Sequence, residues 1–223
     1  MYVGWCMKTN LHTVTVETSI FRARELMEAH KISHLPVTDG KAHLLGIVTD
    51  RDLKEAWASP ATTLSIHELT YALQRLNVGN IMTKKVITST PDMTIERAAQ
   101  IILQRKIGAL PVVESGKLVG IITITDLMEV LLTAVGMGDD TKRLSLLVRD
   151  RIGMLAEIGK YMQQAGINIA SVMTVPLSGH EHVWQFILRV KQTEVDQAVE
   201  ALTRAGFKPV VEYVEDLTPY LPR

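Results

Sequence analysis

The sequence lacks most of the features that assign a protein to a chemical class at first sight. Among 223 residues the only cysteine is Cys6, which excludes a disulfide within the chain and indicates a reducing compartment. Lys and Arg together number 24, as do Asp and Glu, so the formal net charge is zero. A protein that acts mainly by neutralising phosphates would carry a basic excess, so nucleic acid is not an expected partner.

Long apolar runs are also missing. No stretch approaches the roughly 20 residues that span a bilayer. Residues 1–7 lack the basic flank of a signal peptide and are followed at once by Lys8. We therefore expect a cytoplasmic protein with no membrane partner.

Catalytic motifs are absent as well. There is no Gly-x-Ser-x-Gly, P-loop or dinucleotide fingerprint. His30 and His34 are four residues apart and His180 and His182 share a turn, but neither pair has a third ligand at suitable spacing. We expect no catalytic residue and no metal. A cryptic enzyme stays a rival hypothesis that only turnover of a bound ligand would support.

The dominant feature that is present is an internal repeat. A shift of 75 residues superimposes Met7 on Met82, Ile20 on Ile95 and Pro36 on Pro111. After a one-residue slip in a turn, a shift of 74 superimposes Gly46, Thr49 and Asp52 on Gly120, Thr123 and Asp126. Two copies are therefore predicted at 1–58 and 80–136, joined by a linker at 59–79 with a helix over 65–76.

Each copy has the pattern β-α-β-β-α. In the second copy Thr94 is a candidate N-cap, strands are expected over 110–113 and 118–122, and a helix follows Thr123. The pattern then changes. Residues 142–215 predict strands at 144–148, 167–175, 183–190 and 207–214 around two helices, the first ended by Gly166. That order is βαββαβ, a ferredoxin-like unit, so the fold class is α+β.

The most specific motif is Gly-x-x-Thr-x-x-Asp, which ends a buried strand and opens a helix in both copies. Helix N-termini favour anions, and an Asp one turn in can accept both hydroxyls of a ribose. Thr-x-x-Asp is also close to a capping box, which needs no ligand. Both interpretations can hold at once.

With the Leu-Pro-Val segments at 35–37 and 110–112, these motifs make residues 7–56 and 82–130 resemble a tandem pair of cystathionine-β-synthase (CBS) domains. The resemblance implies two clefts for adenine nucleotides or adenosyl ligands. Asp52 and Asp126 would hold ribose hydroxyls, with Thr49 and Thr123 beside ribose or phosphate. The backbone near Thr88 and Val112 would read adenine in one cleft, and that near Thr13 and Val37 in the other.

The two copies differ where the CBS family often contacts phosphate. His34 has Ala109 as its counterpart, and Arg51 has Thr125. A cleft with His34 and Arg51 would suit phosphates better, so one cleft can be empty.

Residues 143–214 resemble an ACT domain, a small-molecule-sensing module. Asp150, Gly153 and Asn168 match its ligand-binding positions, but Ile152 stands where the family usually has Pro. The resemblance implies either an amino-acid site or a module that only dimerises. The order CBS, CBS, ACT resembles the AcuB family of acetoin-utilisation proteins.

Together these patterns predict a regulatory sensor without catalysis. It would bind AMP, ADP, ATP or a related adenosyl compound as regulatory ligand, form a homodimer, and signal to an unknown protein target in acetoin or acetate metabolism. The alternative is an amino-acid-sensing ACT dimer whose CBS pair is structural.

Overall fold

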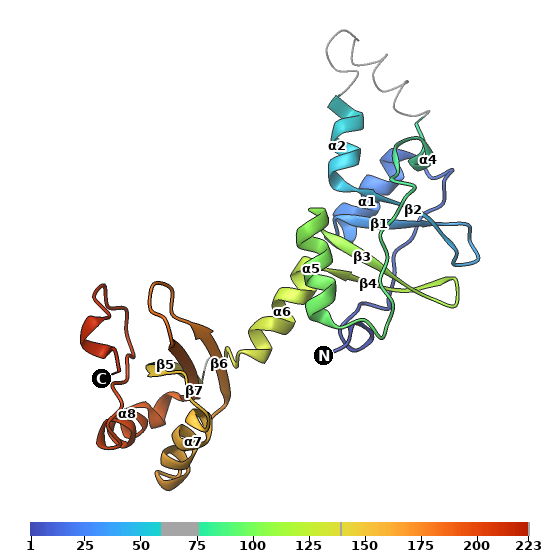
Figure 1. The fold of residues 1–223 in the computed structure, drawn as a ribbon. Coiled ribbons are helices and arrows are strands. Elements are labelled where there is room, and N and C mark those ends of the chain that lie inside the picture. Colours follow the sequence, from blue (N-terminus) through green and yellow to red (C-terminus); the bar gives the residue numbers. More distant parts are fainter. Residues whose placement is uncertain (59–75, 139, 223) are drawn as a thin grey trace. The chain divides into compact units, whose positions relative to one another are not determined.

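The chain forms two compact units, Met1–Met128 and Glu129–Arg223 (Figure 1). The computed structural model describes residues 1–58, 76–138 and 140–222. The predicted 65–76 helix lies almost wholly outside the described residues. No helix in the described ranges is long and apolar enough to cross a membrane.

The first unit contains the first sequence repeat and most of the second, whose last helix continues beyond Met128. The first repeat consists of α1 (Ile20–His30), β1 (His34–Thr38), β2 (Leu44–Thr49) and α2 (Asp50–Ala58). The second consists of α5 (Ile95–Arg105), β3 (Ala109–Glu114), β4 (Lys117–Thr123) and α6 (Ile124–Ala134). Two short helices precede these sets, η1 (Val3–Trp5) and α4 (Val78–Ile81).

The helices α1 and α5 begin and end in the same way. The Ser19 hydroxyl accepts the Arg22 N–H at 3.2 Å, and the Thr94 hydroxyl accepts the Arg97 N–H at 3.3 Å. Such caps satisfy amides that have no partner within the helix. Both helices end at a lysine with a left-handed backbone, Lys31 and Lys106, each with φ of 53°. The predicted cap at Thr94 is confirmed.

Each repeat is built on an antiparallel hairpin, β1–β2 or β3–β4, with a bulge at the same place in both. The first strand of each repeat is reduced to a single parallel bridge, Val14 to Val37 and Ser89 to Val112. Allowing for this, the predicted β-α-β-β-α order is confirmed.

The repeats exchange the segment that precedes these bridges. Lys8 of the first repeat pairs with Ile121 on β4, through backbone bonds of 2.9 and 3.0 Å. Thr83, just before the second repeat's bridge, pairs with Ile47 on β2 through bonds of 2.9 and 3.0 Å. Each hairpin therefore has a neighbour from the other repeat.

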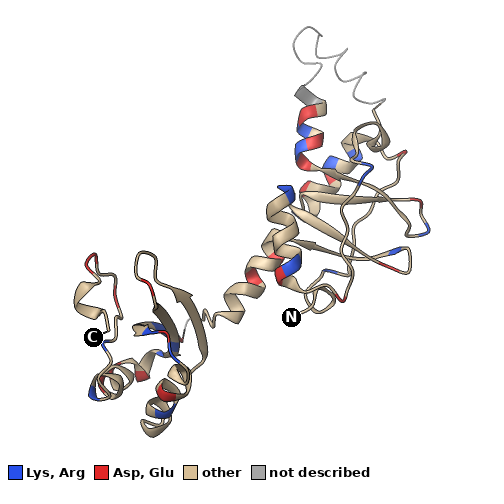
Figure 2. Ribbon diagram, viewed as in Figure 1, with Lys and Arg blue, Asp and Glu red and all other residues tan. Residues whose placement is uncertain are grey.

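Apolar side chains pack where the repeat pattern predicts. The core of the first repeat is continuous and joins the inner face of α1 to the hairpin. Its buried members include Ile20, Ala23, Leu35, Val37 and Val48. Acidic and basic residues are interspersed along α1 and α2 (Figure 2), in keeping with the zero net charge.

The second unit has a three-stranded antiparallel sheet in the order β5-β7-β6. Its strands are β5 (Thr141–Arg149), β6 (Ser171–Pro176) and β7 (Val183–Lys191). Its helices are α7 (Met154–Gln164) and α8 (Val195–Arg204), with short turns η2 (Gln192–Glu194) and η3 (Thr218–Tyr220). A separate core joins both helices to the sheet. The ferredoxin-like class is confirmed.

Two strand limits differ from expectation. The strand expected from 167 begins at Ser171, because the Ile167 amide instead donates to the Met162 carbonyl and closes α7. The strand expected over 207–214 is reduced to one bridge between Val210 and Ser145, with two bonds of 2.8 Å. The Phe207 amide donates instead to the Leu202 carbonyl and closes α8.

Candidate functional site

The two Gly-x-x-Thr-x-x-Asp motifs fold into the same capping arrangement. The Thr49 amide and hydroxyl both donate to Asp52 Oδ2, at 2.8 and 2.7 Å, and the Asp52 amide donates to Thr49 Oγ1 at 3.2 Å. Thr123 and Asp126 repeat these bonds at 2.8, 2.6 and 3.3 Å. The capping interpretation is confirmed. In both copies it uses only one carboxylate oxygen.

The glycine of each motif is needed for close packing between repeats. A Cβ on Gly46 would lie 2.5 Å from Met82 Sδ and 3.0 Å from the Thr83 carbonyl. A Cβ on Gly120 would lie 2.4 Å from Met7 Sδ and 3.2 Å from the Lys8 carbonyl. The motif glycines therefore let the exchanged segments approach the hairpins.

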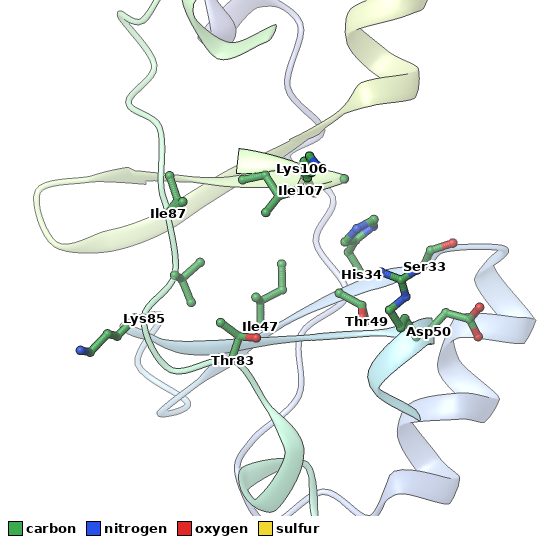
Figure 3. Close-up of a pocket in the computed structure, with 14 residues that line it drawn as sticks. Ser33, His34, Ile47, Thr49, Asp50, Thr83, Lys85, Ile87, Lys106 and Ile107 are labelled. Carbon is green, nitrogen blue, oxygen red and sulfur yellow. The ribbon is translucent and has the colours of Figure 1, made fainter. Parts of the chain in front are cut away.

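A cleft of about 430 Å³, here the first cleft, lies beside the first motif. Residues from four segments line it: 33–34, then 47 and 49–51, then 83 and 85–87, and finally 106–109. Ile87 and Ile107 lie across it from Ile47, and Lys85 and His34 lie toward opposite ends (Figure 3). Asp52 is joined to its wall through Thr49.

A second cleft, of about 250 Å³, has the equivalent lining. Lys8, Asn10, Leu11 and His12 take the places of Thr83, Lys85, Val86 and Ile87. In the same way, 121 and 123–125 correspond to 47 and 49–51, and 31–34 correspond to 106–109. The structure therefore contains two clefts related by the repeat. Each takes its Thr-x-x-Asp motif from one repeat and its facing wall from the other.

His34 and Gly108 line both clefts. Gly108 leaves room for the ring, since a Cβ there would lie 2.7 Å from His34 Nε2. Burial lowers the pKa of His34 below 6.5, and the charge of Asp52 opposes this shift only in part. At neutral pH the His34 side chain that lines the first cleft is therefore a neutral imidazole rather than a cation.

The clefts differ in charge. Among the described residues that line the first cleft, Arg51, Lys85 and Lys106 are basic and only Asp50 is acidic, and Asp50 pairs with Lys54 at 2.6 Å. The second is lined by Lys8 and Lys31. Lys8 Nζ lies 2.9 Å from Asp126 Oδ1, and the Asp126 side chain is only 6% exposed.

The structure brings some predicted site residues together and leaves others apart. His34, Thr49 and Arg51 line the first cleft, and Thr123 lines the second. Thr88, Val112, Thr13 and Val37 adjoin or form the parallel bridges without belonging to either lining. Sequence reasoning missed Lys8, Thr83, Lys85 and Lys106. The 75-residue shift could have found these pairs, because it aligns Lys8 with Thr83 and Lys31 with Lys106.

The three predicted ACT positions are not among the described residues that line the cavity beside the start of α7. Gly153 precedes α7 with φ of 86°, the Asp150 amide donates to the His182 carbonyl at 2.8 Å, and Asn168 is exposed. The cavity, of about 490 Å³, is lined by other residues, among them Arg149, Arg151 and Lys208.

No group of three or more His, Cys, Asp or Glu side chains within the described ranges could hold a metal ion. His30 stacks instead on His12, with ring centroids 3.6 Å apart.

Comparison with known families decides what these units are. The CBS domain family matches residues 3–59 and 78–133, and the ACT domain family matches residues 142–207. The chain is a CBS-pair protein with a C-terminal ACT domain. Its first unit carries nearly all of the CBS pair, which ends at residue 133, and its second carries the ACT domain.

Curated relatives cover this CBS-pair protein to different extents. A CBS domain-containing protein of Dictyostelium discoideum is 32% identical over 127 residues, covering 56% of this chain and 88% of the relative. Inosine-5'-monophosphate dehydrogenase of Staphylococcus aureus is 30% identical over 215 residues, covering 94% of this chain. The match spans only 40% of that enzyme's own length.

Solved structures resemble the CBS pair. CBSX2 from Arabidopsis thaliana, in a complex with AMP, is 32% identical with a TM-score of 0.51, covering 59% of this chain and 96% of that chain. The acetoin-utilisation protein AcuB from Vibrio cholerae is 30% identical with a TM-score of 0.52, covering 61% and 94%. The CBS pair of protein MJ0100, with 5'-methylthioadenosine and S-adenosyl-L-methionine, is 26% identical with a TM-score of 0.51, covering 59% and 99%.

Proposed function

We propose that this protein is a regulatory sensor whose CBS pair binds an adenine nucleotide or a related adenosyl ligand in the first cleft. The observation that carries the proposal is the lining of that cleft. An apolar wall and three cations line it, and Thr49 joins it to the capped carboxylate of Asp52, whose Oδ1 accepts no hydrogen bond from the described residues. Similar proteins support the proposal, because CBSX2 was solved with AMP and the MJ0100 pair with adenosyl compounds.

The chemistry of the lining gives each group a role. Asp52 Oδ1 would accept ribose hydroxyls, while Oδ2 stays engaged with Thr49. The adenine ring would lie against the apolar side chains of Ile47, Ile87 and Ile107, near the backbone of Thr88 and Val112. Phosphates would face Arg51 and Lys106. The neutral His34 would contribute a hydrogen bond rather than a charge.

We assign the protein no catalytic role. The dehydrogenase relatives share with it only 40% of their length, so their reaction is not carried over to this chain. A sensor acts through the difference in ligand affinity between two states of the protein. Three parts of this function stay predictions: that the protein signals to a target protein, that it is linked to acetoin use, and that it forms a homodimer. Sedimentation at micromolar concentration tests the homodimer, and a monomeric mass would contradict it.

The decisive experiment is isothermal titration calorimetry with AMP, ATP, 5'-methylthioadenosine and S-adenosyl-L-methionine. Asp52→Ala should weaken binding of whichever compound binds wild type by at least tenfold, because the ribose loses its acceptor. Asp196→Ala, an exposed carboxylate on α8 in the other unit, is the matched control and should bind as wild type. Unchanged affinity in Asp52→Ala would show that the assignment is wrong.

The alternative is amino-acid sensing by the ACT domain. It is favoured by Gly153, which opens α7 with a left-handed backbone and leaves the first helical amides beside an exposed loop. It predicts that an amino acid raises the unfolding temperature of the second unit and that Asp150→Ala abolishes this, with no response to nucleotides.

A further inference from the structure

We propose that Lys8 occupies the ribose-binding carboxylate of the second cleft, so that the protein takes one equivalent of ligand, in the first cleft. This inference rests on the proposed function, and it adds which cleft is used and what closes the other.

The carboxylate of Asp126 has both oxygens engaged within the protein. Oδ2 accepts the Thr123 amide and hydroxyl, and Oδ1 lies 2.9 Å from Lys8 Nζ. The Asp126 side chain is only 6% exposed. A ribose that reached it would have to displace the ammonium group first. In the second cleft, the Lys8 ammonium group therefore already binds the carboxylate oxygen that a ribose would need as a hydrogen-bond acceptor.

The carboxylate of Asp52 differs. Among the described residues its hydrogen bonds come from Thr49 alone, and all of them use Oδ2. The residue equivalent to Lys8 is Thr83, which lines the first cleft and carries no charge. Asp52 therefore keeps Oδ1 for an external donor.

The difference lies in the side chains and not in the backbone. Lys8 pairs with Ile121, and Thr83 pairs with Ile47, through the same two backbone bonds. Both residues therefore stand at the same position relative to their motif. Exchanging the two side chains should exchange which of the two carboxylates a lysine occupies.

The ion pair holds under ordinary conditions, yet it is within reach of solvent. Burial pushes the pKa of Asp126 upward, but hydrogen bonds from Thr123 and Lys8 outweigh it and lower that pKa. Asp126 is therefore charged at neutral pH. The Lys8 side chain is 65% exposed, so water and salt screen the pair. Lys8 is a removable occupant rather than part of the core.

The test is the binding stoichiometry of AMP, 5'-methylthioadenosine and S-adenosyl-L-methionine, measured by titration calorimetry on the whole chain. Wild type should bind one equivalent, and Lys8→Thr should bind two. Thr83→Lys alone should weaken binding at least tenfold. The double variant Lys8→Thr with Thr83→Lys should again bind one equivalent, now in the second cleft. Adding Asp126→Ala to this double variant should abolish that binding. Lys84→Thr, which removes the same charge beside the first cleft's lining, should bind one equivalent.

The outcomes separate the two proposals. Two equivalents of similar affinity in wild type, or one equivalent in Lys8→Thr, would overturn the role of Lys8 alone. No binding of any probe to wild type or to Lys8→Thr would overturn the proposed function together with that role. A ligand-free check is the Asp126 carboxyl pKa by carbon-13 NMR, which should rise in Lys8→Thr. An unchanged pKa would show that the ion pair is absent in solution.

Discussion

His34 connects the two clefts, and its ionisation can be followed directly. Because burial lowers its pKa below 6.5, the folded state binds fewer protons than the unfolded state just below that pH. Its contribution to stability is therefore complete above pH 6.5 and is lost as pH falls through the folded pKa. We expect proton NMR to show His34 titrating below 6.5, with the resonance assigned by its absence in His34→Gln. A His34 pKa at or above 6.5 would contradict this.

The motif glycines give a second residue-scale prediction. Gly46→Ala should destabilise the first unit by about 1–3 kcal/mol, because Met82 and the Thr83 backbone stand where the methyl group would go. The matched control is Gly159→Ala inside α7, where a Cβ meets nothing within 4 Å. That change should stabilise its unit by about 0.5–1 kcal/mol. Urea denaturation of both variants measures the difference, and equal effects would contradict it.

At the scale of the element, the caps fix where helices start. Thr94→Ala should cost about 1 kcal/mol, because the Arg97 amide loses its acceptor. Thr94→Ser keeps the oxygen and should restore most of the loss. Chemical denaturation compares the three proteins. A Thr94→Ala variant as stable as wild type would show that water caps the helix equally well.

The elements were largely predictable from the sequence, for identifiable reasons. The repeat shift, the cap at Thr94 and the turn glycine Gly166 are local signals, and the structure has each of them. The strand over 207–214 was wrong, because alternation alone does not reveal that its first amide, that of Phe207, closes α8 and that the ladder has one bridge.

The clefts were only half predictable. The motif residues follow from spacing within one repeat. The facing wall comes from the other repeat, so Lys8 and Thr83 could be placed beside Asp126 and Asp52 only once the exchanged segments were known. The four backbone positions of the predicted adenine contact and the ACT positions stay predictions.

At the scale of the whole molecule, the two units have separate hydrophobic cores. Unfolding should therefore show two calorimetric transitions. A ligand at 100 times its dissociation constant adds about 2.7 kcal/mol to the unit that binds it. We expect scanning calorimetry with an adenosyl ligand to move only the transition of the first unit. Leu202→Ala, in the second core, identifies the other transition by lowering it. A ligand shift confined to that other transition would move the site to the ACT domain.

The exchange of segments between repeats bears on how such a protein can arise. A single repeat contains a Thr-x-x-Asp motif, but the wall that faces this motif comes from the other repeat. One repeat alone therefore has no complete binding site. A one-repeat ancestor could build clefts only by pairing with itself, and symmetry would make both clefts identical. Gene duplication and fusion remove that symmetry. Position 8 and position 83 then accumulate changes separately, as lysine and threonine have here.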